Sequence, residues 1–282
     1  MINNTNSVLV RLHVSFWSGY RHDKVASKEA VEKHKMEKGS INSNKKLVSK
    51  MHLKAMKDVV TKFKTYFNDN TLPYNDLLAT RILPTSQAIE FRKEVDIAQG
   101  LLNKTVSDFM DSYDEILEDA RERLGTLFNM HDYPNKEDLP RKFAITVIMM
   151  PVPNPDQFNK AISNKEVQRL QQRLEDMSIM AKMDLIYRVE KVAATLLDTL
   201  EKPGKRIYKT TVQHNIDKVS HQLEELNYEN DPLLQETKEF FDERLLGMRI
   251  EDVRDSPRYR KKMIGKVNEV LDFVNEIIKE AE

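Results

Sequence analysis

The chain has 282 residues, of which 40% are hydrophobic, seven are glycine and none is cysteine. The absence of cysteine excludes disulfides, thiolate metal sites and cysteine catalysis, and so few glycines argue against a glycine-rich phosphate loop. Forty-five basic and 45 acidic residues cancel, so no overall charge favours nucleic acid or an anionic membrane. The sequence shows neither a signal peptide nor an apolar run of membrane-spanning length, so we expect a cytoplasmic protein.

The first part of the chain predicts a strand followed by helices. Residues 7–17 place apolar side chains at every second position, which is typical of a strand with one buried face. Residues 23–38 are charged and helix-prone, and residues 45–67 repeat apolar side chains at helical spacing, which predicts a first main helix. Residues 68–84 contain two prolines, each of which disfavours helix at the residue before it, so we expect an ordered irregular connection.

The longest apolar stripe predicts one continuous helix at 86–128. Apolar side chains from Phe91 to Leu127 recur in ten steps over 36 residues, which is the 3.6-residue period of a straight α-helix. At about 1.5 Å per residue such a helix is roughly 65 Å long, which exceeds the ~50 Å expected width of a compact chain of this size. We therefore expect an elongated molecule in which other helices cover this stripe.

A second strand and a second long helix follow. Residues 143–150 are apolar on both faces, which favours a buried strand, and we expect it to pair with residues 7–17 as a small two-stranded β-ribbon on the helices. The helix at 163–200 begins with a capping box, Ser163 and Glu166, and would be the antiparallel partner of the helix at 86–128.

Residues 205–282 predict a C-terminal region of shorter helices. Asp231-Pro232 and Ser256-Pro257 each place a capping side chain before a proline at the first helical position. The predicted fold is therefore a mainly α protein forming one elongated body. It has long antiparallel helices, a small two-stranded β-ribbon and shorter C-terminal helices.

Basic residues gather between positions 21 and 64, where thirteen basic and five acidic residues give a charge of +8. Four of the lysines would form one ridge of the helix at 45–67. They are Lys46, Lys50, Lys54 and Lys57. Such a ridge could neutralise phosphates, which makes nucleic acid a candidate ligand. The alternative is internal neutralisation, because residues 108–138 carry a charge of −7.

A second basic group lies in the first turn of the last predicted helix. It comprises Arg258, Arg260 and Lys261 together with Lys262. Cations at a helix N-terminus oppose the helix dipole, by about 0.3–1 kcal/mol each at the surface, which invites a functional explanation. Acidic residues just upstream can neutralise them. They are Glu251, Asp252 and Asp255. We treat the basic group as candidate nucleic-acid or partner contacts.

Two patterns could suggest a metal site. One helix face would carry Asp111, Glu115, Glu118 and Glu122. This face lacks the facing Glu-x-x-His pairs of a di-metal bundle. A second face would carry His214, Asp217 and His221. This second face lacks the i, i+4 histidine pair usual for helical zinc. We interpret both as solvated faces and predict no metal, no cofactor and no catalytic residue.

Several short stretches within residues 7–160 form an ordered set. They are Val14-Ser-Phe-Trp-Ser with Asp23-Lys24, Asn70-Thr-Leu-Pro-Tyr74, Arg81-Ile-Leu-Pro84, Ala120-Arg-Glu-Arg-Leu124, Leu127-Phe-Asn129, Asp132-Tyr-Pro134 and Met149-Met-Pro-Val-Pro153. Together they resemble an uncharacterised bacteriophage family, a domain of unknown function of about this length. The resemblance implies no catalytic residue. It marks Trp17, Asp23, Lys24 and Tyr133 as motif residues, of which Trp17 and Tyr133 would be packing anchors or, alternatively, recognition residues.

Relatives in that family tend to be encoded near a MoxR-type AAA+ ATPase and a von Willebrand factor A-type protein similar to cobaltochelatase subunits. The resemblance therefore implies a protein of the infected host's cytoplasm with one of these as a partner. We expect a non-enzymatic adaptor or scaffold that works through protein–protein contacts, and a homo-oligomer is compatible with long stripes that leave apolar surface uncovered. The alternative is nucleic-acid binding through the basic ridge, followed at a distance by a metal-dependent enzyme.

Overall fold

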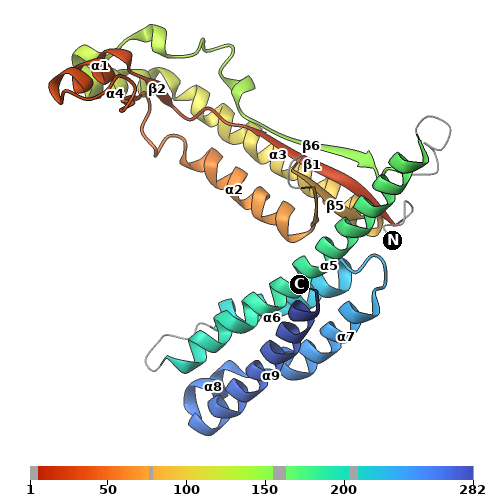
Figure 1. The fold of residues 1–282 in the computed structure, drawn as a ribbon. Helices are drawn as coiled ribbons and strands as arrows, with labels where there is room; N and C mark the ends of the chain where they lie inside the picture. Colours follow the sequence, from red (N-terminus) through yellow and green to blue (C-terminus); the bar gives the residue numbers. More distant parts are fainter. Residues whose placement is uncertain (1–5, 76–78, 155–162, 203–208, 282) are drawn as a thin grey trace. The chain divides into compact units, whose positions relative to one another are not determined.

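The computed structural model describes residues 6–75, 79–154, 163–202 and 209–281, and it is mainly α-helical, as predicted (Figure 1). The sequence predicts one body, whereas the contacts within the chain divide it into two compact units. Unit 1 comprises Met1–Arg11, Phe67–Phe91 and Ile148–Glu282, and unit 2 comprises Leu12–Tyr66 and Arg92–Val147.

The two predicted strands are neighbours, but they belong to a larger sheet. β1 (Ser7–Ser15) and β6 (Ala144–Pro151) lie side by side in a four-stranded sheet of order β4-β5-β1-β6. The segment predicted to be irregular supplies β4 (Leu72–Asn75) and β5 (Thr80–Pro84), and β5 is antiparallel to both β1 and β4. The prolines are tolerated because one lies on the edge strand β4 and the other ends β5.

A separate antiparallel ribbon joins β2 (Tyr20–His22) to β3 (Asn44–Lys46), and α1 (Lys24–Lys33) lies between them in the sequence. The prediction of a helix beginning at residue 45 is wrong, because residues 44–46 pair as a strand and the amide of Leu47 donates to the carbonyl of Gly19. The helix of this segment is α2 (Lys54–Asp69).

The prediction of one unbroken helix at 86–128 is also wrong. α3 (Ala88–Asp111) and α4 (Tyr113–Leu124) are separated by Ser112, whose ψ of 6° departs from helical values. Serine favours helix ends because its short polar side chain competes for backbone hydrogen bonds. The apolar stripe keeps its phase across the break. Its buried members there are Phe109, Tyr113 and Ile116. Short 3-10 turns occupy Thr85–Gln87, Gly125–Leu127, Met130–Asp132 and Pro140–Lys142.

The helices after residue 163 follow the prediction more closely. α5 (Asn164–Glu201) starts where Ser163 accepts a hydrogen bond from the amide of Glu166. The C-terminal region, whose residues 205–208 lie outside the described residues, contains several shorter helices. They are α6 (Lys209–Glu225), α7 (Pro232–Phe241), a π-helical turn (Asp242–Leu246), α8 (Ile250–Asp255) and α9 (Pro257–Ala281). Asp231 and Ser256 cap α7 and α9, as their spacing before proline predicts.

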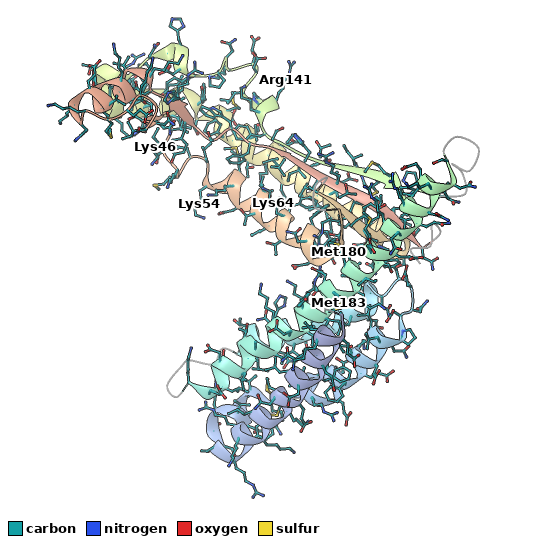
Figure 2. The ribbon with its side chains drawn as sticks, viewed as in Figure 1. Lys46, Lys54, Lys64, Arg141, Met180 and Met183 are labelled. Carbon is teal, nitrogen blue, oxygen red and sulfur yellow. The ribbon has the colours of Figure 1, made fainter. Side chains whose placement is uncertain are left out.

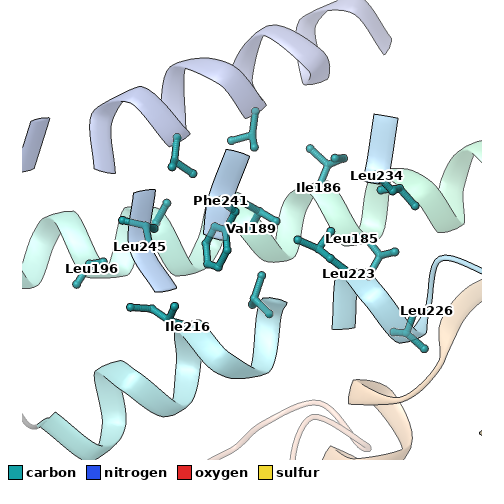
Figure 3. Packing of buried hydrophobic residues seen from close by; sticks show 14 of the residues in the cluster. Leu185, Ile186, Val189, Leu196, Ile216, Leu223, Leu226, Leu234, Phe241 and Leu245 are labelled. Carbon is teal, nitrogen blue, oxygen red and sulfur yellow. The ribbon is translucent and has the colours of Figure 1, made fainter. Parts of the chain in front are cut away.

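The apolar face of α5 is covered by α9, α6, α7 and β4 within unit 1. Figure 3 shows the side chains that meet there. They are Leu185, Ile186, Val189 and Leu196 of α5, Ile216, Leu223 and Leu226 in and just after α6, and Leu234, Phe241 and Leu245. These neighbours take the place that the sequence analysis gave to the helix at 86–128.

Unit 2 has an apolar core of its own. The ring of Phe143 meets Phe16 at 5.3 Å and Phe109 at 6.2 Å between ring centroids, edge-on in both pairs. Other buried members come from α2, α3 and the segment before β6. They include Met56, Phe63, Leu102 and Leu139. Each unit therefore buries apolar faces of its own helices.

Replacing Phe241, which is fully buried in the core of unit 1, with alanine should lower the free energy of unfolding by about 3–5 kcal/mol. Urea denaturation followed by the helical circular-dichroism signal measures this change. The control is Ile89→Ala, because that side chain on α3 is 75% exposed and its loss should cost less than about 0.5 kcal/mol. Equal losses in the two variants would contradict the packing described above.

Candidate functional site

The four lysines of the predicted ridge do not share one helix face. Lys46 ends β3 and Lys54 begins α2, as labelled in Figure 2. Lys50 lies in the turn between them, and Lys57 is the only other one of the four on α2. Lys54 forms an ion pair with Asp58 one turn further along the same helix, at 2.5 Å. The prediction of a continuous basic ridge is therefore wrong, because the chain around Lys46 is extended.

The acidic segment at 108–138 does neutralise part of the basic segment, but through other residues. Asp132 accepts a hydrogen bond from Nζ of Lys45 at 2.7 Å and lies 3.8 Å from Nε of Arg21. In addition, the guanidinium of Arg123 donates to the carbonyls of Lys46 and Leu47, at 2.8 and 2.9 Å. Charge compensation inside unit 2 is thus centred on β3.

Two of the family-motif residues, Asp23 and Tyr133, build this same neighbourhood. Asp23 caps α1 by accepting from the amides of Val25 and Ala26, and its carboxylate also lies 3.9 Å from Nζ of Lys45. Asp132 holds that ammonium from the other side. The hydroxyl of buried Tyr133 donates to the carbonyl of Leu47 at 2.9 Å, so Tyr133 is a packing anchor.

The other two motif residues have a less defined environment. Trp17 is half-buried beyond the end of β1, and Lys24 is exposed at the first position of α1.

The basic group on α9 lies in unit 1, whereas the lysines of the predicted ridge lie in unit 2. Arg258 and Lys261 are exposed, and Arg260 is half-buried with its Nε free of hydrogen bonds to any described residue. Upstream, Asp252 forms an ion pair with Arg249 at 3.3 Å.

The two sequence patterns that were considered as metal sites lie on solvated helix faces. Nε2 of His221 is 3.0 Å from the carboxylate of Glu225, and Asp217 accepts from Gln213 at 2.7 Å. His214 is exposed on α6, and the four carboxylates at 111–122 are exposed on α3 and α4. Among the described residues, no group of three or more His, Asp or Glu side chains is arranged to hold a metal ion.

A cleft of about 450 Å³ in unit 1 lies beside the C-terminal end of α2. Its charged lining residues are Arg81, Arg188, Lys191, Lys218, Asp69 and Asp184. The guanidinium of Arg188 donates to the carbonyls of residues 68, 69 and 71 at 2.8–3.0 Å and to the carboxylate of Asp184. Arg81 donates to two of the same carbonyls, and Lys218 pairs with Asp69 at 2.7 Å.

The chemistry of this cleft is mainly structural. The last carbonyls of a helix have no partner within the helix and form the negative end of its dipole, so cations stabilise them. Arg81 and Arg188 supply those cations to α2, and most of their N–H donors are used in doing so. The cleft therefore does not present free guanidinium groups to an anionic ligand.

No family model, curated protein or solved structure matches this chain. None of the described helices is both long enough and apolar enough to cross a lipid bilayer.

Two exposed apolar surfaces were not singled out by the sequence analysis. Ile97 and Leu101 on α3 are 53% and 51% exposed, and Ile179, Met180 and Tyr187 on α5 are 54%, 41% and 46% exposed. Met180 and Met183 are both labelled on α5 in Figure 2, and of the two only Met180 is exposed, while Met183 is half-buried. The sequence pattern could have identified them, because these apolar side chains lie outside the stripe that each helix buries, on the face where polar residues are expected.

Two buried tyrosines in unit 2 differ in their hydrogen bonds. The hydroxyl of Tyr133 donates to Leu47, whereas the hydroxyl of Tyr113 has no hydrogen-bond partner among the described residues. Burial raises the pKa of Tyr113 to about 12, and the nearby Tyr133 and Asp114 add to the increase. The folded protein thus keeps Tyr113 neutral but leaves its hydroxyl unsatisfied.

The same substitution at these two positions should therefore have opposite effects. Tyr113→Phe removes an unsatisfied buried hydroxyl and should raise the free energy of unfolding by about 1–3 kcal/mol. Tyr133→Phe breaks a hydrogen bond and should lower the free energy of unfolding by about 0.5–1.5 kcal/mol. Urea titrations at about pH 8 measure both changes. Changes of the same sign would contradict this account of the two hydroxyls.

The alkaline range gives a second measurement on Tyr113. The pKa of Tyr113 is higher in the folded chain than its ordinary value of 10.0. Below pH 10.0 the hydroxyl is neutral in the folded and the unfolded chain, so its ionisation does not change stability. As the pH rises from 10.0 towards about 12, the unfolded chain ionises first and the free energy of unfolding falls. Between these pH values the unmodified protein should lose stability more steeply than Tyr113→Phe. Parallel pH profiles for the two proteins would contradict the raised pKa.

Proposed function

We propose that the chain is a non-enzymatic adaptor that works through protein–protein contacts made by exposed apolar faces on α3 and α5. The supporting observation is that large apolar side chains remain exposed on helices whose opposite faces are already buried. On α3, Ile97 and Leu101 are one turn apart and about half exposed, while Val95 and Leu102 are buried on the other side. A partner helix or groove that covered this pair would remove apolar area from water, at about 25 cal/mol per Å².

The face on α5 supports the adaptor role because it lies in unit 1, whereas Ile97 and Leu101 lie in unit 2. Each unit therefore offers one exposed apolar surface for a protein–protein contact. The resemblance to the bacteriophage family supports a MoxR-type AAA+ ATPase or a von Willebrand factor A-type protein in the host cytoplasm as the partner.

A photo-crosslinking amino acid at position 97 should form an adduct of one defined mass in host cells, because the partner would cover that position. Mass spectrometry identifies the adduct, and one of the two proteins just named is expected. Leu101→Glu in the same chain should abolish the adduct without changing the helical circular-dichroism signal, since it places a charge in an apolar contact.

Asn103 is the matched control, because it is also exposed on α3 but lies away from the apolar pair. A crosslinker there should give no adduct. Equal adducts from positions 97 and 103, or none from position 97, would count against the adaptor function.

Nucleic-acid binding is a second candidate function, and a revised basic surface on α2 supports it. Lys57 and Lys64 lie two turns apart along one line of the helix, and Lys62 projects from the other edge of its exposed face. These exposed lysines have no ion pair within the described part of the chain, unlike Lys54. Phosphates could supply their counter-charge.

If nucleic acid binds there, replacing Lys57, Lys62 and Lys64 together with glutamate should abolish retention of duplex DNA. For the unmodified protein, the logarithm of the binding constant should fall against the logarithm of salt concentration with a slope of roughly −3, at about −0.9 per phosphate neutralised. The control carries the same charge change at three other exposed lysines of unit 2, Lys33, Lys35 and Lys38. No retention of DNA at about 50 mM salt, or equal loss in the control, would exclude the α2 surface.

A further inference from the structure

The outer face of α5 has a symmetric order of side chains. Asp176, Met180, Tyr187 and Lys191 follow one another at spacings of four, seven and four residues, so they share one line along the helix. All four are exposed. The two apolar residues thus stand in the middle of the line, with an acid at one end and a base at the other.

Neither terminal charge is neutralised by an opposite charge in the part of the chain that the structure describes. The carboxylate of Asp176 accepts a hydrogen bond from the neutral amide of Gln172, at 3.0 Å. Lys191 has no ion pair with any described residue, although its neighbour Arg188 is bonded to Asp184. The outer face therefore carries an acid and a base that are both free to meet a partner.

We infer that a second copy of this chain docks on α5, with the two α5 helices antiparallel and their outer faces in contact. The symmetric spacing then brings Asp176 of each copy to Lys191 of the other, at both ends of the contact. Between these pairs, Met180 of each copy meets Tyr187 of the other. A parallel arrangement would instead place like charges together, so the charges select the antiparallel one.

The side chains at the centre suit such a contact. Methionine is flexible and its sulfur packs favourably against aromatic rings, and tyrosine can bury its ring while its hydroxyl stays in water. The line from Asp176 to Lys191 spans about 22 Å at roughly 1.5 Å per residue. A contact made by one helix from each copy is smaller than the ~1,200 Å² at the lower end of stable interfaces, so the dimer is weak and reversible.

This inference rests on the proposed adaptor function, because it names the occupant of one of the two apolar faces. The face on α3 remains available for a different protein. The crosslinking at position 97 and the self-association on α5 are therefore separate measurements. A monomeric chain that still forms the adduct would refute only the dimer, and a dimeric chain without the adduct would refute only the adaptor function.

Sedimentation equilibrium of the full chain between about 1 and 200 µM tests the dimer, since this range brackets a weak interface. The mass should rise with concentration from 33.0 kDa towards twice that value. Asp176→Lys and Lys191→Asp should each weaken association by about tenfold or more, because both symmetric pairs become repulsive. The combined variant should restore association, because the pairs are re-formed with their charges exchanged.

The matched control is Glu175→Lys, an exposed charge next to Asp176 but away from the line. It should leave the association unchanged, and circular dichroism should show every variant folded. The inference is overturned if the chain stays monomeric at all concentrations, or if the combined variant is folded but does not associate. It is also overturned if Glu175→Lys weakens self-association as much as Asp176→Lys does.

The orientation can be measured separately because the chain has no cysteine. With dissolved oxygen as the oxidant of the two thiols, a tagged Met180→Cys chain mixed with an untagged Tyr187→Cys chain should form the mixed disulfide faster than either chain forms a disulfide with itself. Faster formation of the two homodimers would mean a parallel pair and would overturn the antiparallel arrangement.

Discussion

Backbone carbonyl groups without a partner in their own helix or strand determine where distant segments of this chain meet. At the end of α2, the carbonyl of Asp69 accepts from Arg188 of α5 and from Gln222 of α6. The neighbouring carbonyls of Asn68 and Thr71 accept from Arg188 and from Arg81 of β5. These carbonyls have no partner within the helix, so the end of this one helix brings together donors from three other elements.

Unit 2 uses the same constraint at β3. The carbonyl of Leu47 takes one hydrogen bond from Arg123 and another from Tyr133, and both donors lie more than 70 residues away in the sequence. Lys45 sits between the carboxylates of Asp23 and Asp132 and also donates to the carbonyl of Leu127. Two of the family-motif residues, Asp23 and Tyr133, thus help to hold the β2–β3 ribbon to α1 and to the segment after α4.

This dependence on distant partners explains which parts of the fold could be predicted. α5 was predictable because its stripe and its Ser163 cap are local signals, and α7 and α9 because a capping side chain and a proline stand next to each other. β3 was not predictable, because its lysine-rich segment continues the helical spacing of α2. Partners distant in the sequence hold it extended, namely β2 and the donors from residues 123–133. β4 and β5 were missed because proline argues against a central strand but is compatible with an edge and with a strand end.

The candidate surfaces could also be predicted only in part, because they depend on the same distant contacts. The four-lysine ridge depended on the wrong start of α2 and failed with it, whereas Lys57 and Lys64 kept their predicted helical environment. The exposed apolar residues of α5 were in the sequence, but their role depended on knowing which face α9, α6 and α7 cover. Helical spacing alone cannot separate a half-buried methionine from an exposed one when three methionines lie three residues apart, at 177, 180 and 183.

The zero net charge of the chain is the sum of one basic unit and one acidic unit. Unit 2 contains 21 basic and 17 acidic residues, a charge of +4, and unit 1 contains 24 basic and 28 acidic residues, a charge of −4. Self-association on α5 would use a face of the acidic unit, whereas the basic face of α2 and the apolar face of α3 belong to the basic unit. Each dimer would then present two copies of each remaining surface. A contact that is too weak to persist alone gains strength in a dimer, because the second contact forms at the effective concentration set by the first. A weak self-association can therefore strengthen the binding of the adaptor to its partner.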